Sequence, residues 1–353
     1  MFNLKNQVLF HNQSSLQLSE YITAIQWSKK GHLAMSSAKG EVLIKDESTQ
    51  LILTPADTQG KSINCLAFSG DGNFLAVGGQ DGKVRIWQIS PQISLIEVIE
   101  LGKHWLEHLA WHPSRNILAV SAGSSVQVWD GVRREIVMTL PLAISTVLSL
   151  AWHPQENALA VGGNGKIKVW NLDKSGDEPI FLETLAAITK IAFSWGGEYL
   201  AAVCLDHTVL VWSWGQKDPW RMTGFGAKVR NLAWSELKSG SAPLLAVSSY
   251  GDILVWKKEE NDADGWIAYT LNQHQGVIVD LSFQPDSFLL ASVDEEGGLF
   301  LWKKAKQLAQ SLTSVNQGFS CLSWHPDGKK IATGGEAGEV NIWVKSQRGQ
   351  GFA

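Results

Sequence analysis

Short apolar runs separated by turn residues recur along the chain. Each run holds four to six residues and is rich in the β-branched and aliphatic types that favour strands. Turn sequences stand between them, such as SGDGN at 69–73 and QDG at 80–82. The pattern predicts an all-β chain built from hairpins.

Seven of the 17 tryptophans close one kind of run at a nearly constant spacing. They recur every 41 to 46 residues, at Trp87, Trp129, Trp170, Trp212, Trp256, Trp302 and Trp343. A Leu-Ala or Ile-Ala pair lies 11 or 12 residues before each, and another aromatic closes a run 18 to 22 residues before each. We name the runs a, b, c and d in chain order, so that the tryptophan closes run c. A repeat of roughly 42 residues with four runs is typical of four-stranded propeller blades.

An earlier copy at residues 22–45 places Lys45 where the tryptophan would stand. We therefore expect eight blades, or seven if this first copy is irregular. A fourth run follows most copies but not Trp343, and strand-like segments at 8–10 or 15–18 would supply it. Such closure leaves no unpaired edge. We expect one domain over residues 1–353, with 1–21 as the closing strand, 22–346 as blades and 347–353 as a short tail.

The repeated residues resemble the WD40 (β-transducin-like) repeat family over nearly the whole chain. This resemblance implies a β-propeller that holds protein partners. The family's Trp-Asp pair is kept at Trp129-Asp130, its histidine near strand a is matched by His274, and its aspartate by Asp81 and Asp206. We therefore expect the family's His/Ser/Trp/Asp hydrogen-bond network to be fragmentary in this chain.

Composition narrows the classes of partner. The formal charge of −4 lacks the basic excess that neutralises phosphates, so we expect no nucleic-acid binding. The apolar runs are far shorter than the roughly 20 residues of a membrane-spanning helix, so we expect no membrane insertion. The first 20 residues lack the pattern of a signal peptide, which favours a cytoplasmic location. We expect a protein partner and a monomer.

Cysteine and histidine give no sign of a metal or cofactor. Cys65, Cys204 and Cys321 are too far apart for a CxxC site, and we expect them to be buried small residues. His104 and His108 lie four apart, which on an extended strand is roughly 13 Å, too far to share one ion. Three Trp-His-Pro sequences stand in a–b turns, where we expect the histidines to cover the neighbouring aromatic: His112, His153 and His325.

Five tryptophans lie outside the repeat: Trp105, Trp195, Trp214, Trp220 and Trp266. In an up-and-down blade the a–b and c–d turns share one face of the ring. Three of the five fall in such turns of the blade closed by Trp212, and an acidic insertion at 257–265 of the next blade lies on the same face. Tryptophan is enriched at binding hot spots. The candidate partner-binding residues are Trp195, Trp214, Trp220, Glu259, Glu260 and Asp262. The alternative is that these tryptophans shield the core and the acidic run is a solvated loop.

The opposite face carries the b–c and d–a turns. A weaker hypothesis places a peptide there, at the mouth of the central channel. Its candidate residues are His104, Trp105, Lys228, Arg230 and His274.

Catalytic motifs are missing from the sequence. It contains no GxSxG, no GxxxxGK[ST], no HExxH and no dinucleotide-binding GxGxxG. We therefore expect a non-catalytic interaction scaffold or regulatory platform and no enzyme. The alternative is a ligand-reading or catalytic propeller with its site at the channel mouth.

Overall fold

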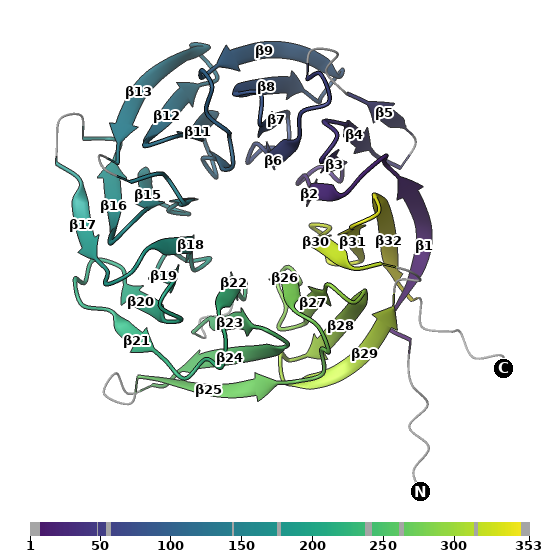
Figure 1. Ribbon diagram of the computed structural model, residues 1–353, viewed down its shortest axis with the longest axis vertical. Coiled ribbons are helices and arrows are strands. Elements are labelled where there is room, and N and C mark those ends of the chain that lie inside the picture. The colour runs from purple at the N-terminus through teal and green to yellow at the C-terminus, as the bar shows by residue number, and fades with distance from the viewer. Residues whose placement is uncertain are drawn as a thin grey trace, which may run out of the picture.

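The computed structural model describes residues 8–47, 49–53, 58–142, 145–174, 178–236, 242–260, 265–313 and 317–346. Within these ranges the chain forms eight four-stranded antiparallel sheets arranged around a central axis (Figure 1). This is an eight-bladed β-propeller, so the predicted fold class and blade count are confirmed. No helix long and apolar enough to cross a membrane occurs in the described ranges.

Each blade runs from an inner strand a to an outer strand d. Blades 1 and 2 contain β2 (Ile22–Trp27), β3 (Leu33–Ser37), β4 (Val42–Lys45), β5 (Gln50–Ile52), β6 (Ile63–Phe68), β7 (Phe74–Gly79), β8 (Lys83–Gln88) and β9 (Ser94–Glu100). Blades 3 and 4 contain β10 (Leu109–Trp111), β11 (Ile117–Ala122), β12 (Ser125–Asp130), β13 (Glu135–Pro141), β14 (Ser149–Trp152), β15 (Ala158–Gly162), β16 (Lys166–Asn171) and β17 (Ile180–Glu183).

The second half of the ring repeats the arrangement. Blades 5 and 6 contain β18 (Ile188–Phe193), β19 (Tyr199–Cys204), β20 (Val209–Ser213), β21 (Trp220–Met222), β22 (Val229–Trp234), β23 (Leu244–Ser249), β24 (Asp252–Lys258) and β25 (Trp266–Leu271). Blades 7 and 8 contain β26 (Ile278–Phe283), β27 (Leu290–Asp294), β28 (Gly298–Lys303), β29 (Gln307–Thr313), β30 (Phe319–Trp324), β31 (Lys330–Gly335), β32 (Glu339–Lys345) and, as strand d, β1 (Phe10–Gln17).

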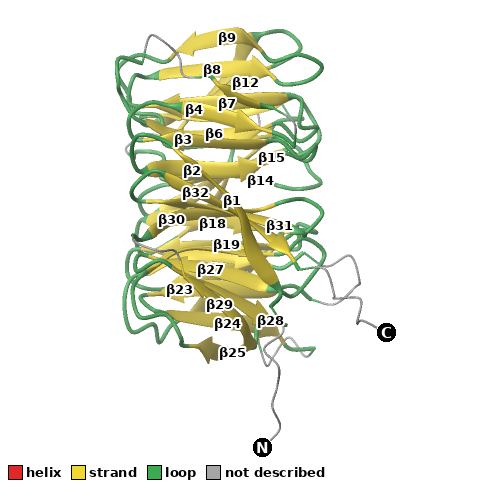
Figure 2. Cartoon of the chain, turned by 90° about the vertical axis from the view of Figure 1, so that its right-hand side faces the viewer, coloured by secondary structure: helices red, strands yellow, loops and turns green. Residues whose placement is uncertain are grey.

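The predicted closure of the ring is confirmed. β1 pairs antiparallel with β32, so the N-terminal strand completes the last blade. The pairing shifts register between Asn12 and Ser14, which leaves Gln13 unpaired. Figure 1 shows β1 at the outer rim beside β32, and Figure 2 shows that the turns gather on two opposite faces of the ring.

The repeat fixes both the register and the core. In seven blades the tryptophan of strand c lies opposite a leucine or isoleucine of strand b, as Trp87 lies opposite Leu75. In blade 1 the same position is Lys45, opposite Leu33. Strand b packs against neighbouring blades on both sides, which is why runs such as Ala158–Gly162 are buried throughout and read as continuous apolar sequence.

Tryptophans that close strand a tie four of the blades to the blade before them. Four of them donate the indole N–H to a carbonyl of the preceding strand a, at 2.8 to 3.1 Å: Trp111 to Ala67, Trp152 to Ala110, Trp234 to Ala192 and Trp324 to Ser282. These bonds satisfy buried N–H and C=O groups near the inner edge of the ring, where a lost partner is costly.

The histidines of the Trp-His-Pro turns cover aromatic rings of the following blade. The ring centroids of His112 and Trp152 lie 4.9 Å apart, and those of His153 and Phe193 also 4.9 Å. His325 packs in the same way against Trp27 at 4.8 Å, across the closure of the ring. Their predicted structural role is confirmed, and the covered aromatic belongs to the next blade in each case.

Candidate functional site

Trp214 belongs to an aromatic cluster between blades 4 and 5. Its ring lies 4.9 Å from those of His153 and Phe193, and its indole N–H donates to Glu156 Oε1 at 3.0 Å. The side chain is half-buried. Trp214 therefore covers the joint between the two blades. This agrees with the alternative that these tryptophans shield the core.

Trp220 belongs to a second cluster, between blades 5 and 6. It opens β21, and its ring lies 6.4 Å from Tyr199 and 6.2 Å from Trp266. Trp266 lies 5.9 Å from Trp234, and Lys258 Nζ lies 5.2 Å from the centroid of Trp220. The lysine and the rings cover one another, so Trp220 is half-buried as well.

Trp195 is the exposed member of the three predicted tryptophans. It stands in the a–b turn of blade 5 with 49% of its surface exposed. The turn around it is firmly placed, because Ser194 is buried and its amide donates to the Tyr199 carbonyl at 2.8 Å. All three tryptophans thus lie on one face of blade 5, but Trp214 turns toward blade 4 and Trp220 toward blade 6.

Carboxylates accompany Trp195 on this face. Glu156 in blade 4, Glu198 in blade 5 and Glu260 in blade 6 are exposed, and Glu259 is half-buried. We call Trp195 and these four glutamates the Trp195 surface. Asp262, also predicted, lies outside the described residues. The surface offers one large apolar side chain on a face that also carries four glutamates, which suits a partner with an apolar pocket and basic residues.

The opposite face displays Trp105 with 60% of its surface exposed. The next residue, Leu106, is fully buried and donates its amide to the Gly79 carbonyl at 3.0 Å, which holds the turn. The His104 ring packs over the b–c turn, since a Cβ on Gly123 would lie 3.1 Å from it. His104 and Trp105 both stand in the turn that leads into blade 3.

Lys228 and Arg230 are also exposed on this side, but they belong to blade 6, three blades further round the ring. The register shift between Val229 and Asn231 leaves Arg230 unpaired in the ladder. The structure therefore does not gather the predicted channel-face residues into one patch.

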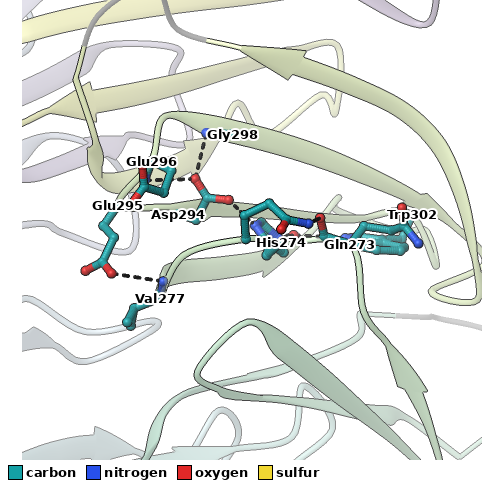
Figure 3. A network of polar contacts seen from close by, with 10 residues as sticks. Gln273, His274, Val277, Asp294, Glu295, Glu296, Gly298 and Trp302 are labelled. Carbon is teal, nitrogen blue, oxygen red and sulfur yellow. Dashed lines mark hydrogen bonds and ion pairs between the residues drawn. The ribbon is translucent and has the colours of Figure 1, made fainter.

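His274 lies inside blade 7. Its Nδ1 is 2.6 Å from Asp294 Oδ2 and its Nε2 is 2.6 Å from Ser292 Oγ, which also accepts the indole N–H of Trp302 at 2.9 Å (Figure 3). The imidazole is fully enclosed, with 0% of the side chain exposed. It serves the hydrogen-bond network that the family resemblance implies, and it does not face the channel.

Asp294 anchors that network and was not found from the sequence. It also accepts the amides of Gly298 at 2.7 Å and Glu296 at 3.1 Å. Burial alone would raise the pKa of Asp294, but the bonds from His274 and these amides outweigh it and lower the pKa below its ordinary value. Asp294 stands eight residues before Trp302, whereas Asp81 and Asp206, which match the family's aspartate, stand six residues before Trp87 and Trp212.

The two aspartates that match the family spacing pair with arginines instead. Asp81 Oδ2 lies 2.6 Å from Arg85 Nη2, with 6% and 1% of the side chains exposed. Asp206 Oδ2 lies 2.7 Å from Arg221 Nη2, with 31% and 40% exposed. The network is therefore complete in blade 7 and replaced by ion pairs in blades 2 and 5.

Charged and polar side chains link the inner strands of blades 5 to 8. Lys190 Nζ donates to Asn231 Oδ1 at 2.9 Å, and Asp280 accepts the amides of Leu322 at 3.0 Å and Leu281 at 2.9 Å. Burial raises the pKa of Asp280, although Lys190 and the two amides oppose the rise. In the sequence, the sign of these links is a charged residue, Lys190 or Asp280, within an otherwise mostly apolar strand a. These groups cross-link blades.

The described residues contain no group of three or more His, Cys, Asp and Glu side chains placed to hold a metal ion. Cys65 and Cys204 are buried, Cys321 is half-buried, and all three are free thiols. Burial raises the pKa of Cys204 to about 11 and that of Cys321 to about 12. Thiols held protonated in this way are poor nucleophiles and ligands.

Comparison with known families gives two matches. Five stretches match the model for the WD domain, G-beta repeat, at residues 97–130, 135–171, 181–213, 265–303 and 307–344, and together they cover just over half of the chain. Residues 25–105 match the model for the anaphase-promoting complex subunit 4 WD40 domain.

Three similar curated proteins are much longer than the region that this chain matches. The U3 small nucleolar RNA-associated protein 4 homolog of Homo sapiens is 30% identical over 30% of this chain and 16% of its own length. Apoptotic protease-activating factor 1 of Rattus norvegicus is 21% identical over 97% of this chain and 30% of its length. Protein HIR1 of Cryptococcus neoformans var. neoformans is 26% identical over 44% of this chain and 20% of its length.

Proposed function

Because this chain belongs to the WD40-repeat family, we propose that it is a non-catalytic platform that holds a protein partner on the Trp195 surface. The observation that carries the proposal is the exposure of Trp195, 49%, directly after the buried Ser194, whose amide donates to the Tyr199 carbonyl at 2.8 Å and holds the turn. A large aromatic side chain held in place loses little entropy on binding, which is why such residues dominate interfaces.

Charge supports the same choice of surface. The glutamates around Trp195 make it negative, so the partner that we propose is a protein segment with basic residues and an apolar contact for the indole. Phosphate groups would be repelled, which supports a protein rather than a nucleic acid or an anionic membrane.

The end of the central channel on the face of the a–b turns favours a platform over an enzyme. A cavity of about 430 Å³ lies there, between residues such as Gln26, Leu66 and Trp324. Glu236 is the one titratable side chain among the residues that line it, so the lining offers no acid and base pair.

The test compares two exposed tryptophans on opposite faces. Wild type, Trp195→Ala and Trp105→Ala, each tagged, are used to capture partners from the cells that make the protein, after circular dichroism has shown equal folding. We expect a partner that wild type and Trp105→Ala retain and Trp195→Ala loses. Loss by Trp105→Ala alone would move the site to the opposite face, and equal capture by all three would refute both surfaces.

A further inference from the structure

A cavity of about 350 Å³ lies between blades 8 and 1, on the face of the a–b and c–d turns. The residues around it include Gln13, Trp27, Lys45, Glu47, Lys330 and Ile342. A cavity of this size is at the lower end of the range that binds small ligands, about 300–1,000 Å³.

The cavity occurs where the repeat lacks its tryptophan. In blade 2 the equivalent Trp87 is 5% exposed and packs in a cluster with Ile44 and Phe68, which fills the joint with blade 1. At the joint of blades 8 and 1 the same register position carries Lys45. A lysine chain is much narrower than an indole, so the space that a ring fills elsewhere stays open.

Trp27 shows the effect of the missing ring. In blade 3 the corresponding Trp111 packs edge to face on the repeat tryptophan Trp129 at 6.2 Å and donates its N–H to a carbonyl. Trp27 packs instead on His325, and its buried indole N–H has no hydrogen-bond partner among the described residues. One wall of the cavity is therefore an aromatic ring without its usual aromatic neighbour.

Two lysines, Lys45 and Lys330, and two carboxylates, Asp46 and Glu47, line the cavity. Glu47 Oε1 is engaged by Lys330 Nζ at 3.1 Å, and Asp46 Oδ1 accepts the amide of Thr49 at 2.6 Å. The ammonium of Lys45 makes no ion pair or hydrogen bond to any residue that the structure describes, although the side chain is half-buried. Lys45 is thus a half-buried cation to which an occupant with a carboxylate could supply a partner.

We propose that this cavity takes an aromatic side chain of a protein partner, with a carboxylate beside the ring that pairs with Lys45. The ring stands where the repeat tryptophan stands in the other seven blades, between Trp27 and Ile342. The site lies on the same face as the Trp195 surface but across the ring from it, and it does not depend on that surface.

Two small probes separate the ring from the charge. N-acetyltryptophan carries the indole and a carboxylate, and N-acetyltryptophanamide carries the same indole without the charge. We expect saturation-transfer NMR titrations to show both binding to the wild-type protein, the acid about two- to fivefold more tightly, as a partly exposed ion pair allows. Failure of the wild type to bind either probe would overturn the proposal.

Substitutions at Lys45 locate the site. Lys45→Trp restores the repeat residue, so we expect it to raise the melting temperature and abolish binding of both probes. Lys45→Met keeps the space and removes the charge, so both probes should bind equally. The matched control is Lys257→Trp, at an exposed lysine of strand c in a blade that already has its tryptophan, and it should change neither property.

Three outcomes contradict the proposal. If Lys45→Trp folds and binds both probes as wild type does, the probes bind elsewhere. If Lys45→Trp melts below wild type or fails to fold, the space does not fit an indole. If Lys45→Met keeps the preference for the acid, the ammonium has no role in binding. Trp195→Ala should leave probe binding unchanged, so failure here is distinct from failure of the proposed function.

Discussion

Asp294→Ala should destabilise the propeller far more than the matched change at the exposed aspartate Asp206. The carboxylate is 2% exposed and accepts three donors, from His274, Gly298 and Glu296. Alanine leaves all three without that acceptor in the interior of blade 7. The loss extends to Ser292 and Trp302, because the Ser292 hydroxyl bonds to His274 and also accepts the indole N–H of Trp302.

The magnitude follows from burial. An orphaned buried donor costs about 1–3 kcal/mol, and His274 and the Gly298 amide would both lose a charged acceptor, which is the stronger kind of hydrogen bond. The Glu296 amide lies next to an exposed turn, so losing its acceptor adds little to the loss of stability. We therefore expect a loss of about 3–5 kcal/mol for Asp294→Ala. The matched control, Asp206→Ala, removes a pair whose side chains are 31% and 40% exposed, and should cost about 1 kcal/mol or less.

Urea unfolding followed by tryptophan fluorescence measures both variants against wild type. Asp294→Asn keeps one acceptor oxygen, should lose less, and provides a measurable variant if the alanine form does not fold. The lowered pKa also fixes the pH dependence: the contribution of Asp294 is present above its ordinary value of 3.8 and is lost as the pH falls through the folded value. Equal losses for Asp294→Ala and Asp206→Ala would refute the reasoning.

Three further predictions concern the blade joints and buried groups. Trp152→Phe removes the bond to the Ala110 carbonyl and should cost roughly 1–2 kcal/mol in the same urea assay; no change would show that this bond does not hold the ring together. Burial, assisted by Lys190, lowers the pKa of His108 below 6.5, so its contribution to stability is present above that value and is lost at lower pH. His108→Gln should therefore lose less stability than wild type between about pH 7.5 and 5.5 in thermal melts, and parallel losses would contradict this. Cys204 and Cys321, whose pKa values burial raises to about 11 and about 12, should react with Ellman's reagent only on unfolding; rapid labelling of the native protein would contradict their protonated state.

The repeat made the ring predictable from sequence. The spacing of the tryptophans depends on the strand pairing within one blade, and nearly the same pattern recurs in every blade. Eight copies and the closing strand could therefore be predicted from local sequence. The Trp-His-Pro turns were predicted for the same reason, because His112 recurs as His153 and His325 at equivalent positions.

Features that depend on the neighbouring blade could not be predicted. Trp214 is half-buried because His153, in blade 4, packs against it, and Trp220 because Trp266, in blade 6, does. Neither contact corresponds to a fixed spacing of residues in the sequence. Asp294 was missed because the carboxylate reaches His274 from a position two residues away from the family's usual one. The cavity at Lys45 likewise requires two blades and the closure of the ring.

A photocrosslinking amino acid placed at position 195 tests the central claim most directly. The full chain, with p-benzoylphenylalanine at 195 or at 105, is produced in the cells that normally contain the protein and irradiated, and crosslinked peptides are identified by mass spectrometry. The account predicts a partner protein joined at 195 through a segment with basic residues, and no such adduct at 105. Adducts at 105 and none at 195 would contradict it.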